Sequence, residues 1–183
     1  MNDDRYTTPA IALHWLMAIM LVAIWGVGQY MHELPLSPQK LQIYSWHKWA
    51  GVTAFVLVVV RLAWRIGHAP PALPTAMSAT MQRAAHAGHA VLYLLMFAVP
   101  LTGWLMSSAY GFQTVWFGAL PIPDLLGKDK ALGDTLKAVH GLLNWLLALA
   151  VTGHVLAAIK HQLIDKDCLL ARMSWRRASK ETP

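Results

Sequence analysis

Residues 136–164 read LKAVHGLLNWLLALAVTGHVLAAIKHQLI, a run in which almost every side chain is apolar. A helix rises about 1.5 Å per residue, so this run is long enough to cross the ~30 Å hydrocarbon core of a bilayer. His140 and His154 interrupt it, 14 residues apart. On an α-helix that spacing advances about 21 Å and returns to within about 40° of the starting direction. The run therefore predicts a spanning helix with two histidines on one face at two depths.

Three other runs are also long enough to span a membrane, at about residues 9–31, 45–66 and 82–108. The 183-residue chain is 56% hydrophobic and 13% charged, whereas a soluble domain has about 25% charged residues. These values predict an all-α fold, a transmembrane four-helix bundle over residues 1–164 with a basic tail over residues 165–183.

The distribution of basic residues predicts the orientation. Four spans place the N-terminus, the second loop and the tail on one side, together with ten of the 15 Lys and Arg. The positive-inside rule then puts both termini in the cytoplasm of a bacterial cell, with the bundle in the inner membrane. The net charge of +6 is concentrated at this membrane surface, so we expect lipid and not nucleic acid as its partner. The N-terminus lacks a basic n-region, so we expect the first run to be retained as a span.

Two other segments carry weaker signals. The outer loop at residues 109–135 holds Trp116 and Phe117, which predict a short interfacial helix or turn at headgroup level. Cys168 is the single cysteine, which excludes an internal disulfide and a c-type haem attachment, and we assign it no role.

The four histidines within the apolar runs form two pairs by topology. The first span rises from the inner side, so His14 at its start is inner, and the second descends, so His47 is outer. The fourth span also descends, which makes His140 outer and His154 inner. Histidine in a bilayer faces the protein interior and marks a functional site, and neutral imidazole is a common axial ligand of haem iron. The pairs His14/His154 and His47/His140 therefore predict a bundle enclosing two b-type haems.

Other interpretations of these histidines remain. A membrane histidine can simply hydrogen-bond to a neighbouring helix. A different metal centre would need a tight cluster of His with Asp, Glu or Cys, and the apolar runs carry almost no carboxylates. The scarcity of carboxylates also disfavours a proton-relay transporter.

Further polar residues lie at the inner level. His86 and His89 are one helical turn apart, and either is an alternative ligand to His14, although His89 is better placed as a donor to a haem propionate. Arg61 and Arg65 suit bidentate pairing with propionates, and they suit positive-inside anchoring equally well.

The histidines stand within an ordered set of motifs. The set comprises Ala12-Leu13-His14-Trp15, His47 with Gly51, Val60-Arg61-Leu62, Ala85-His86-Ala87-Gly88-His89 followed by Leu92-Tyr93, Pro100 with Gly103, His140, His154, and Lys166-Asp167-Cys168-Leu169-Leu170-Ala171-Arg172-Met173. Over nearly its whole length the chain resembles the bacterial cytochrome b561 family. The resemblance implies two b haems held by His14/His154 and His47/His140, and electron transfer between a periplasmic reactant and the quinone pool. One branch resembles a superoxide oxidase and others resemble membrane electron carriers, and Asp165 and the outer loop depart from the familiar pattern.

The leading hypothesis is a superoxide:ubiquinone oxidoreductase whose chemistry is outer-sphere electron transfer, with no catalytic side chain. Lys48, Lys130 and Lys137 would steer the anion at the outer face. For the quinone site, an apolar ring beside a polar donor favours Trp15, His161 and Trp175. The alternatives are a non-catalytic electron-transfer subunit that serves a periplasmic redox partner through the outer loop, and a haem-free structural bundle.

Overall fold

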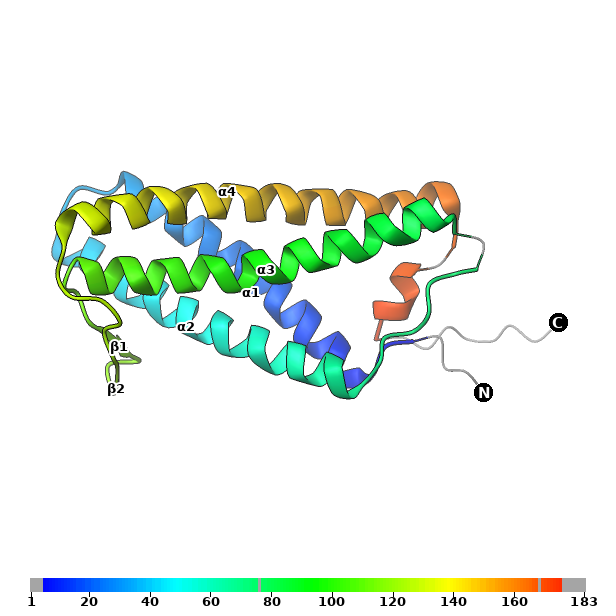
Figure 1. Cartoon of the computed structure of the whole chain (residues 1–183), viewed down its shortest axis with the longest axis horizontal. Helices are drawn as coiled ribbons and strands as arrows, with labels where there is room; N and C mark the ends of the chain where they lie inside the picture. The colour runs from blue at the N-terminus through cyan, green and yellow to red at the C-terminus, as the bar shows by residue number, and fades with distance from the viewer. Residues whose placement is uncertain (1–4, 76, 168, 176–183) are drawn as a thin grey trace.

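The computed structural model describes residues 5–75, 77–167 and 169–175. Four long helices form a bundle: α1 (Thr8–Glu33), α2 (Pro38–Gly67), α3 (Ala79–Ala109) and α4 (Lys130–Lys160), as Figure 1 shows. Each is long and apolar enough to cross a membrane. The predicted all-α four-helix bundle is confirmed.

Three helices begin earlier than the apolar runs, because polar residues cap their first turns. Ser37 accepts a hydrogen bond from the Lys40 amide at 3.2 Å, and α2 therefore starts at Pro38 rather than near residue 45. Asp129 accepts one from the Leu132 amide at 3.0 Å and starts α4 at Lys130. Such caps satisfy amide groups that have no partner within the helix.

The outer loop contains a β-hairpin closed by a tight turn, and not the short helix that was one of the two expectations. Strands β1 (Thr114–Trp116) and β2 (Leu120–Ile122) pair antiparallel, and Figure 1 shows them at one end of the bundle. Their connection places Phe117 and Gly118 at positive φ, +50° and +71°, which closes a tight turn. The Trp49 indole N–H donates to the Val115 carbonyl at 2.6 Å and fastens the hairpin to α2.

Lys48 also fastens this end of the bundle. Its ammonium group lies 3.1 Å from the Ser107 hydroxyl, 3.1 Å from the Phe112 carbonyl and 3.3 Å from the Gln113 carbonyl. Lys130 pairs with Asp134 at 2.9 Å. Of the three lysines expected to steer an anion, Lys48 is thus a structural tie and Lys130 is partly neutralised.

The buried core lies between the two levels of histidines. It is built from Met17 of α1, Val58 of α2, Leu95 and Met96 of α3, and Leu147 of α4. Many large apolar residues outside this core are exposed, as expected for helices that face lipid. A cluster of buried apolar residues therefore separates the two levels of histidines.

The two ends of the described chain meet at the inner end of the bundle. After α4 come a π-helical turn, η1 (His161–Asp165), and a 3-10 helix, η2 (Leu169–Met173), which Figure 1 shows at the end opposite the hairpin. The Tyr6 amide donates to the Arg172 carbonyl at 3.3 Å, and the Arg5 guanidinium donates to the Ser174 carbonyl. Arg172 itself donates to the Ala72 carbonyl at 2.6 Å.

Part of the predicted basic tail, residues 176–183, lies outside the described residues, as does Cys168.

Gly133 allows a close contact between α4 and the end of α3. An added Cβ there would lie 2.8 Å from the Tyr110 ring. The Tyr110 hydroxyl donates to the Asp134 carboxylate at 2.7 Å, and this hydrogen bond raises the pKa of Tyr110. The position has no room for a side chain while Tyr110 keeps its place.

We expect Gly133→Ala to destabilise the bundle by about 1–3 kcal/mol through overpacking. Thermal unfolding in detergent, followed by circular dichroism, measures the effect. Gly141→Ala is the matched control on α4, because nothing lies within 4 Å of its added Cβ. Removal of the ring with Tyr110→Ala should make Gly133→Ala harmless. A Gly133→Ala protein that unfolds at the Gly141→Ala temperature would contradict the contact.

Candidate functional site

The turn of α3 around Pro100 receives the ring of His140 from α4. Pro100 has no amide hydrogen, so one helical hydrogen bond is missing from this turn. His140 Nδ1 lies 3.0 Å from the Val99 carbonyl and 3.2 Å from the Thr102 hydroxyl. Because a carbonyl only accepts, Nδ1 carries the proton and Nε2 keeps its lone pair. This is the tautomer that a metal-ligating histidine needs, held by a backbone partner.

Two glycines make room for the outer histidines. A Cβ at Gly103 of α3 would lie 3.0 Å from His140 Cε1, and one at Gly28 of α1 would lie 3.2 Å from His47 Cε1. His47 Nδ1 is buried and has no hydrogen-bond partner among the residues that the structure describes. Its ring and that of His140 are near enough to interact electrostatically. The outer end thus presents two half-buried imidazoles, each with a nitrogen free to bind a ligand.

Three histidines meet at the inner end. His154 of α4 has its ring centroid 6.2 Å from that of His14 and 5.6 Å from that of His89. The three imidazoles come from α1, α3 and α4, so either His14 or His89 could share a haem iron with His154. His86, one turn before His89, is exposed.

The Arg61 guanidinium bonds to His14, and this bond bears on whether His14 or His89 is the second iron ligand beside His154. Its Nη2 donates to His14 Nδ1 at 2.9 Å, which leaves the proton of a neutral His14 on Nε2. Coordination through Nε2 requires that this nitrogen lose its proton or that Arg61 turn to another acceptor. His89 carries no such bond. The geometry therefore leaves His14 and His89 both open as partners of His154.

The inner cluster holds positive charge without a matching acid. Arg61 and Arg65 lie over the Tyr93 ring, 5.7 Å and 5.9 Å from its centroid. No carboxylate pairs with either guanidinium in the part of the chain that the structure describes. Charge inside a membrane needs a partner, so this cluster suits a ligand with anionic groups.

The nitrogen donors and guanidinium groups of these residues fit b-type haem at both ends of the bundle. The outer end offers His140 Nε2, the unpartnered His47 Nδ1 and space kept by two glycines. The inner end offers His154 between two other imidazoles, beside two guanidiniums that could neutralise propionates. Sequence reasoning missed Gly28, Val99 and Thr102, because nothing in an apolar run distinguishes a residue that faces a histidine.

The residues predicted for the quinone site lie at the inner end, but they differ in exposure and in whether their polar groups already have a hydrogen-bond partner. The Trp15 indole N–H donates to the Met173 carbonyl at 2.8 Å and ties η2 to α1, so it is already occupied. The Trp175 side chain is exposed. The His161 side chain is 13% exposed, and its Nδ1 lies 2.6 Å from the Asp167 carboxylate.

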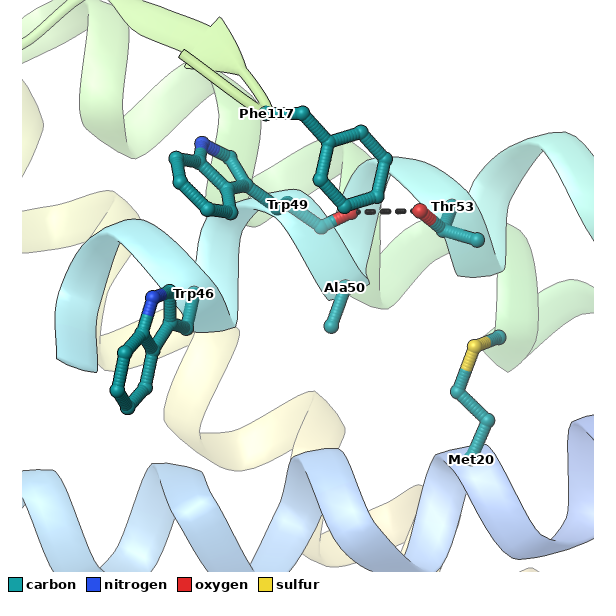
Figure 2. A pocket seen from close by; sticks show the side chains of 6 residues that line it. All are labelled: Met20, Trp46, Trp49, Ala50, Thr53 and Phe117. Atoms are coloured by element: carbon teal, nitrogen blue, oxygen red, sulfur yellow. Dashed lines mark hydrogen bonds between the residues drawn. The ribbon is translucent and has the colours of Figure 1, made fainter. Parts of the chain in front are cut away.

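A pocket of about 370 Å³, with no histidine in its lining, lies between α1, α2 and the hairpin. Figure 2 shows its lining, which is Met20, Trp46, Trp49, Ala50, Thr53 and Phe117. Its hydroxyl group, on Thr53, already donates to the Trp49 carbonyl at 2.9 Å and accepts from the Trp116 indole at 3.2 Å. The pocket is therefore apolar in character and suits lipid contact better than recognition of a polar ligand.

Comparison with known proteins identifies the family of this chain. The family model described as Prokaryotic cytochrome b561 matches residues 5–176. The chain belongs to this cytochrome b561 family. It is 33% identical over 179 residues to Cytochrome b561 homolog 2 of Escherichia coli, covering 97% of this chain and 95% of that protein. It is 30% identical over 169 residues to Probable superoxide oxidase CybB of Yersinia pestis, covering 92% and 95%.

Membership confirms the resemblance seen in the motifs, and it implies that this membrane cytochrome binds b-type haem. The family and the four spans together indicate a multi-pass protein of the bacterial inner membrane that exchanges electrons with redox partners. A third relative, Cytochrome b562 of Cereibacter sphaeroides, is 28% identical over 178 residues and spans 94% of this chain and 96% of its own length.

Gly28 provides a test of the outer site. Gly28→Leu should push the His47 ring out of place and lower the amount of haem bound per chain, measured as the pyridine haemochrome. Gly26→Leu on the same helix is the control, because nothing lies within 4 Å of a Cβ at Gly26. Equal haem content in both variants would show that the space beside His47 is not needed for binding.

Proposed function

We propose that this cytochrome b561 family member is a di-haem superoxide:ubiquinone oxidoreductase that carries electrons from the periplasmic face to the inner membrane quinone pool. The observation that carries the proposal is the placement of histidines at two levels. His140 and His154 come from one helix, and each lies near histidines of other helices, His47 at one end and His14 with His89 at the other.

The residues proposed to hold the haems follow from this placement. His47 and His140 would bind the outer iron, and His14 and His154 the inner iron, with His89 beside them. Haem with two histidine ligands supplies one-electron, outer-sphere transfer, because no coordination position remains open. The protein's part is to hold the imidazoles in position, exclude water and neutralise charge. Val99 and Thr102 hold the His140 imidazole in position and fix its tautomer.

At the inner end, Arg61, Arg65 and His89 are proposed to interact with propionates. In this role Arg61 turns from His14 Nδ1 to a carboxylate, which frees His14 for coordination. The competing role for both arginines is anchoring at a cytoplasmic membrane surface. The anchoring role requires the inner end, and with it both termini, to face the cytoplasm.

Superoxide is proposed as the donor because the relative from Yersinia pestis is named a probable superoxide oxidase. Three lysines are predicted to steer superoxide, and of these Lys137 remains a candidate because it is exposed. Lys48 instead bonds to the Ser107 hydroxyl, and Lys130 pairs with Asp134. The outer side carries five basic residues against four acidic ones, so the expected steering is weak.

Ubiquinone is proposed as the acceptor, bound at the inner end near His161 and Trp15. The indole of Trp15 contributes an apolar ring, while its N–H serves η2. An imidazole that can donate a hydrogen bond is the second component of such a site.

The visible spectrum of the purified protein tests the whole proposal. Enzymatically generated superoxide should produce the reduced α-band of b-type haem, and ubiquinone added afterwards should remove it. A band that appears only with dithionite would favour the alternative of a carrier fed by a periplasmic partner protein. Exposed Phe112 and Phe117, 68% and 63% accessible at the hairpin end, are the surface such a partner would contact. Absence of a band with every reductant would leave a haem-free bundle.

Substitution of single histidines should separate the two haem sites. His140→Ala and His154→Ala are each expected to reduce the haem content from two per chain to one, measured by pyridine haemochrome and by redox titration. His14→Ala should lose the inner haem, whereas His89→Ala should retain it with a shifted potential. Loss of the inner haem in His89→Ala with retention in His14→Ala would instead assign His89 as the ligand.

Lys137→Ala should slow haem reduction by superoxide a few-fold at low ionic strength. The difference should vanish at high salt, because screening removes long-range attraction. Lys137→Arg is the control, since it keeps the positive charge at this position. Equal rates of haem reduction for wild type and Lys137→Ala at low salt would show that Lys137 does not steer superoxide.

A further inference from the structure

We propose that Arg5 and Arg172 form a binding site for the phosphate group of an anionic phospholipid at the inner end of the bundle. The site lies where the two ends of the described chain meet, and electron transfer between haems does not use it. The inference goes beyond the proposed function, because it requires only that the four helices cross a membrane.

Three segments that are distant in the sequence bring the two arginines to one junction. The Tyr6 amide donates to the Arg172 carbonyl at 3.3 Å, and Arg5 Nη2 donates to the Ser174 carbonyl. Arg172 Nη1 donates to the Ala72 carbonyl at 2.6 Å. Figure 1 shows η2 beside the start of α1 and the connection that leads into α3. Two guanidinium groups therefore belong to a single small region of the inner surface.

The guanidinium group of Arg5 has an unused donor. Its Nε is buried and has no hydrogen-bond partner among the described residues. Nε and Nη2 form one edge of the planar guanidinium, an edge that can make two parallel hydrogen bonds to a carboxylate or a phosphate. A buried donor without an acceptor is costly, and a native protein that keeps one commonly has a bound ion or water there. The free Nε therefore points to an acceptor that the chain does not supply.

The positive charge of the junction is also unmatched. Neither Arg5 nor Arg172 takes part in an ion pair between described residues. Both donate to backbone carbonyl groups, which carry no net charge. Asp165 and Asp167, which precede η2, pair with side chains of α4 and η1 instead. The missing acceptor is therefore best supplied by an anion.

The apolar residues around the junction favour a lipid over a free anion. Trp175 and Leu170, in the same segment as Arg172, are 59% and 44% exposed. Basic residues beside an exposed indole and an exposed leucine are typical of a segment that lies at a membrane surface. A phospholipid offers a phosphate to the guanidiniums and acyl chains to the apolar side chains. A lipid with net negative charge suits the site best, because a zwitterionic headgroup brings its own cation.

A lipid held at this site would stabilise the inner end. It would connect the start of α1 and η2 to the bilayer through one phosphate group. Because a ligand that binds only the folded state stabilises it, the thermal midpoint should be higher in phosphatidylglycerol nanodiscs than in phosphatidylcholine nanodiscs. The expected difference is about 2–4 °C.

The affinity for single lipids tests the site directly. Native mass spectrometry of the delipidated, full-length cytochrome in detergent measures the Kd of the first phospholipid bound. Wild type should bind phosphatidylglycerol more tightly than phosphatidylcholine. Arg5→Gln and Arg172→Gln should each weaken phosphatidylglycerol binding by about 5-fold, the usual contribution of one basic residue at an anionic membrane surface. Glutamine keeps an N–H donor for the carbonyl partner, so it removes charge with little change in the backbone contacts.

Matched variants separate charge at the junction from charge elsewhere and from loss of structure. Arg83→Gln removes an exposed arginine at the start of α3, whose Nε donates to the Ala79 carbonyl of its own helix at 3.4 Å, and it should bind phosphatidylglycerol as wild type does. The double variant Arg5→Lys/Arg172→Lys keeps both charges and should retain most of the affinity. Inorganic phosphate should not displace the lipid.

Four results would overturn the proposal. One is equal phosphatidylglycerol affinity in Arg5→Gln, Arg172→Gln and Arg83→Gln. A second is equal affinity of wild type for the two lipids, since net charge would then play no part. Displacement of the lipid by inorganic phosphate would show that the site takes the free anion. A lysine double variant that binds as weakly as the glutamine double variant would show that a disturbed junction, and not lost charge, weakens binding.

Discussion

A ring nitrogen in a hydrocarbon environment has no water to bond to, and this constraint bears on all four histidines of the bundle. Each apolar helix provides its own backbone hydrogen bonds, whereas an imidazole either finds a partner on another helix or keeps an unpaired nitrogen. His140 finds the Val99 carbonyl in the Pro100 turn of α3, and His14 finds Arg61 of α2. His47 finds space beside Gly28 and keeps a buried nitrogen unpaired.

These needs also explain how the bundle is divided. Apolar packing fills its middle, where Met17, Val58 and Leu147 meet, while the imidazoles occupy the levels on either side. An arrangement with polar rings at two depths and a dry layer between them suits transfer of electrons rather than passage of ions. Family membership agrees, since it makes the chain a membrane b-type cytochrome.

The two ends of the bundle are closed by different means. At the outer end, Lys48 and the indole of Trp49 bind carbonyl groups of the connection that carries the hairpin. At the inner end, Trp15 and Arg172 tie η2 to α1 and to the connection before α3. Long polar side chains and indole groups are suited to forming these hydrogen bonds at the ends of the bundle, because their apolar parts can remain in the membrane interface.

The sequence by itself determined the four spans and the relative depth of His14, His47, His140 and His154. Helix length and direction depend on local hydrophobicity and on the alternation of sides, and both can be counted along the chain. Only the tertiary structure decided that Arg61 lies on His14, that Gly28 makes room for His47, and that residues 114–122 pair as strands. Such contacts depend on helix rotation and turn conformation, which periodicity in a uniformly apolar segment does not specify.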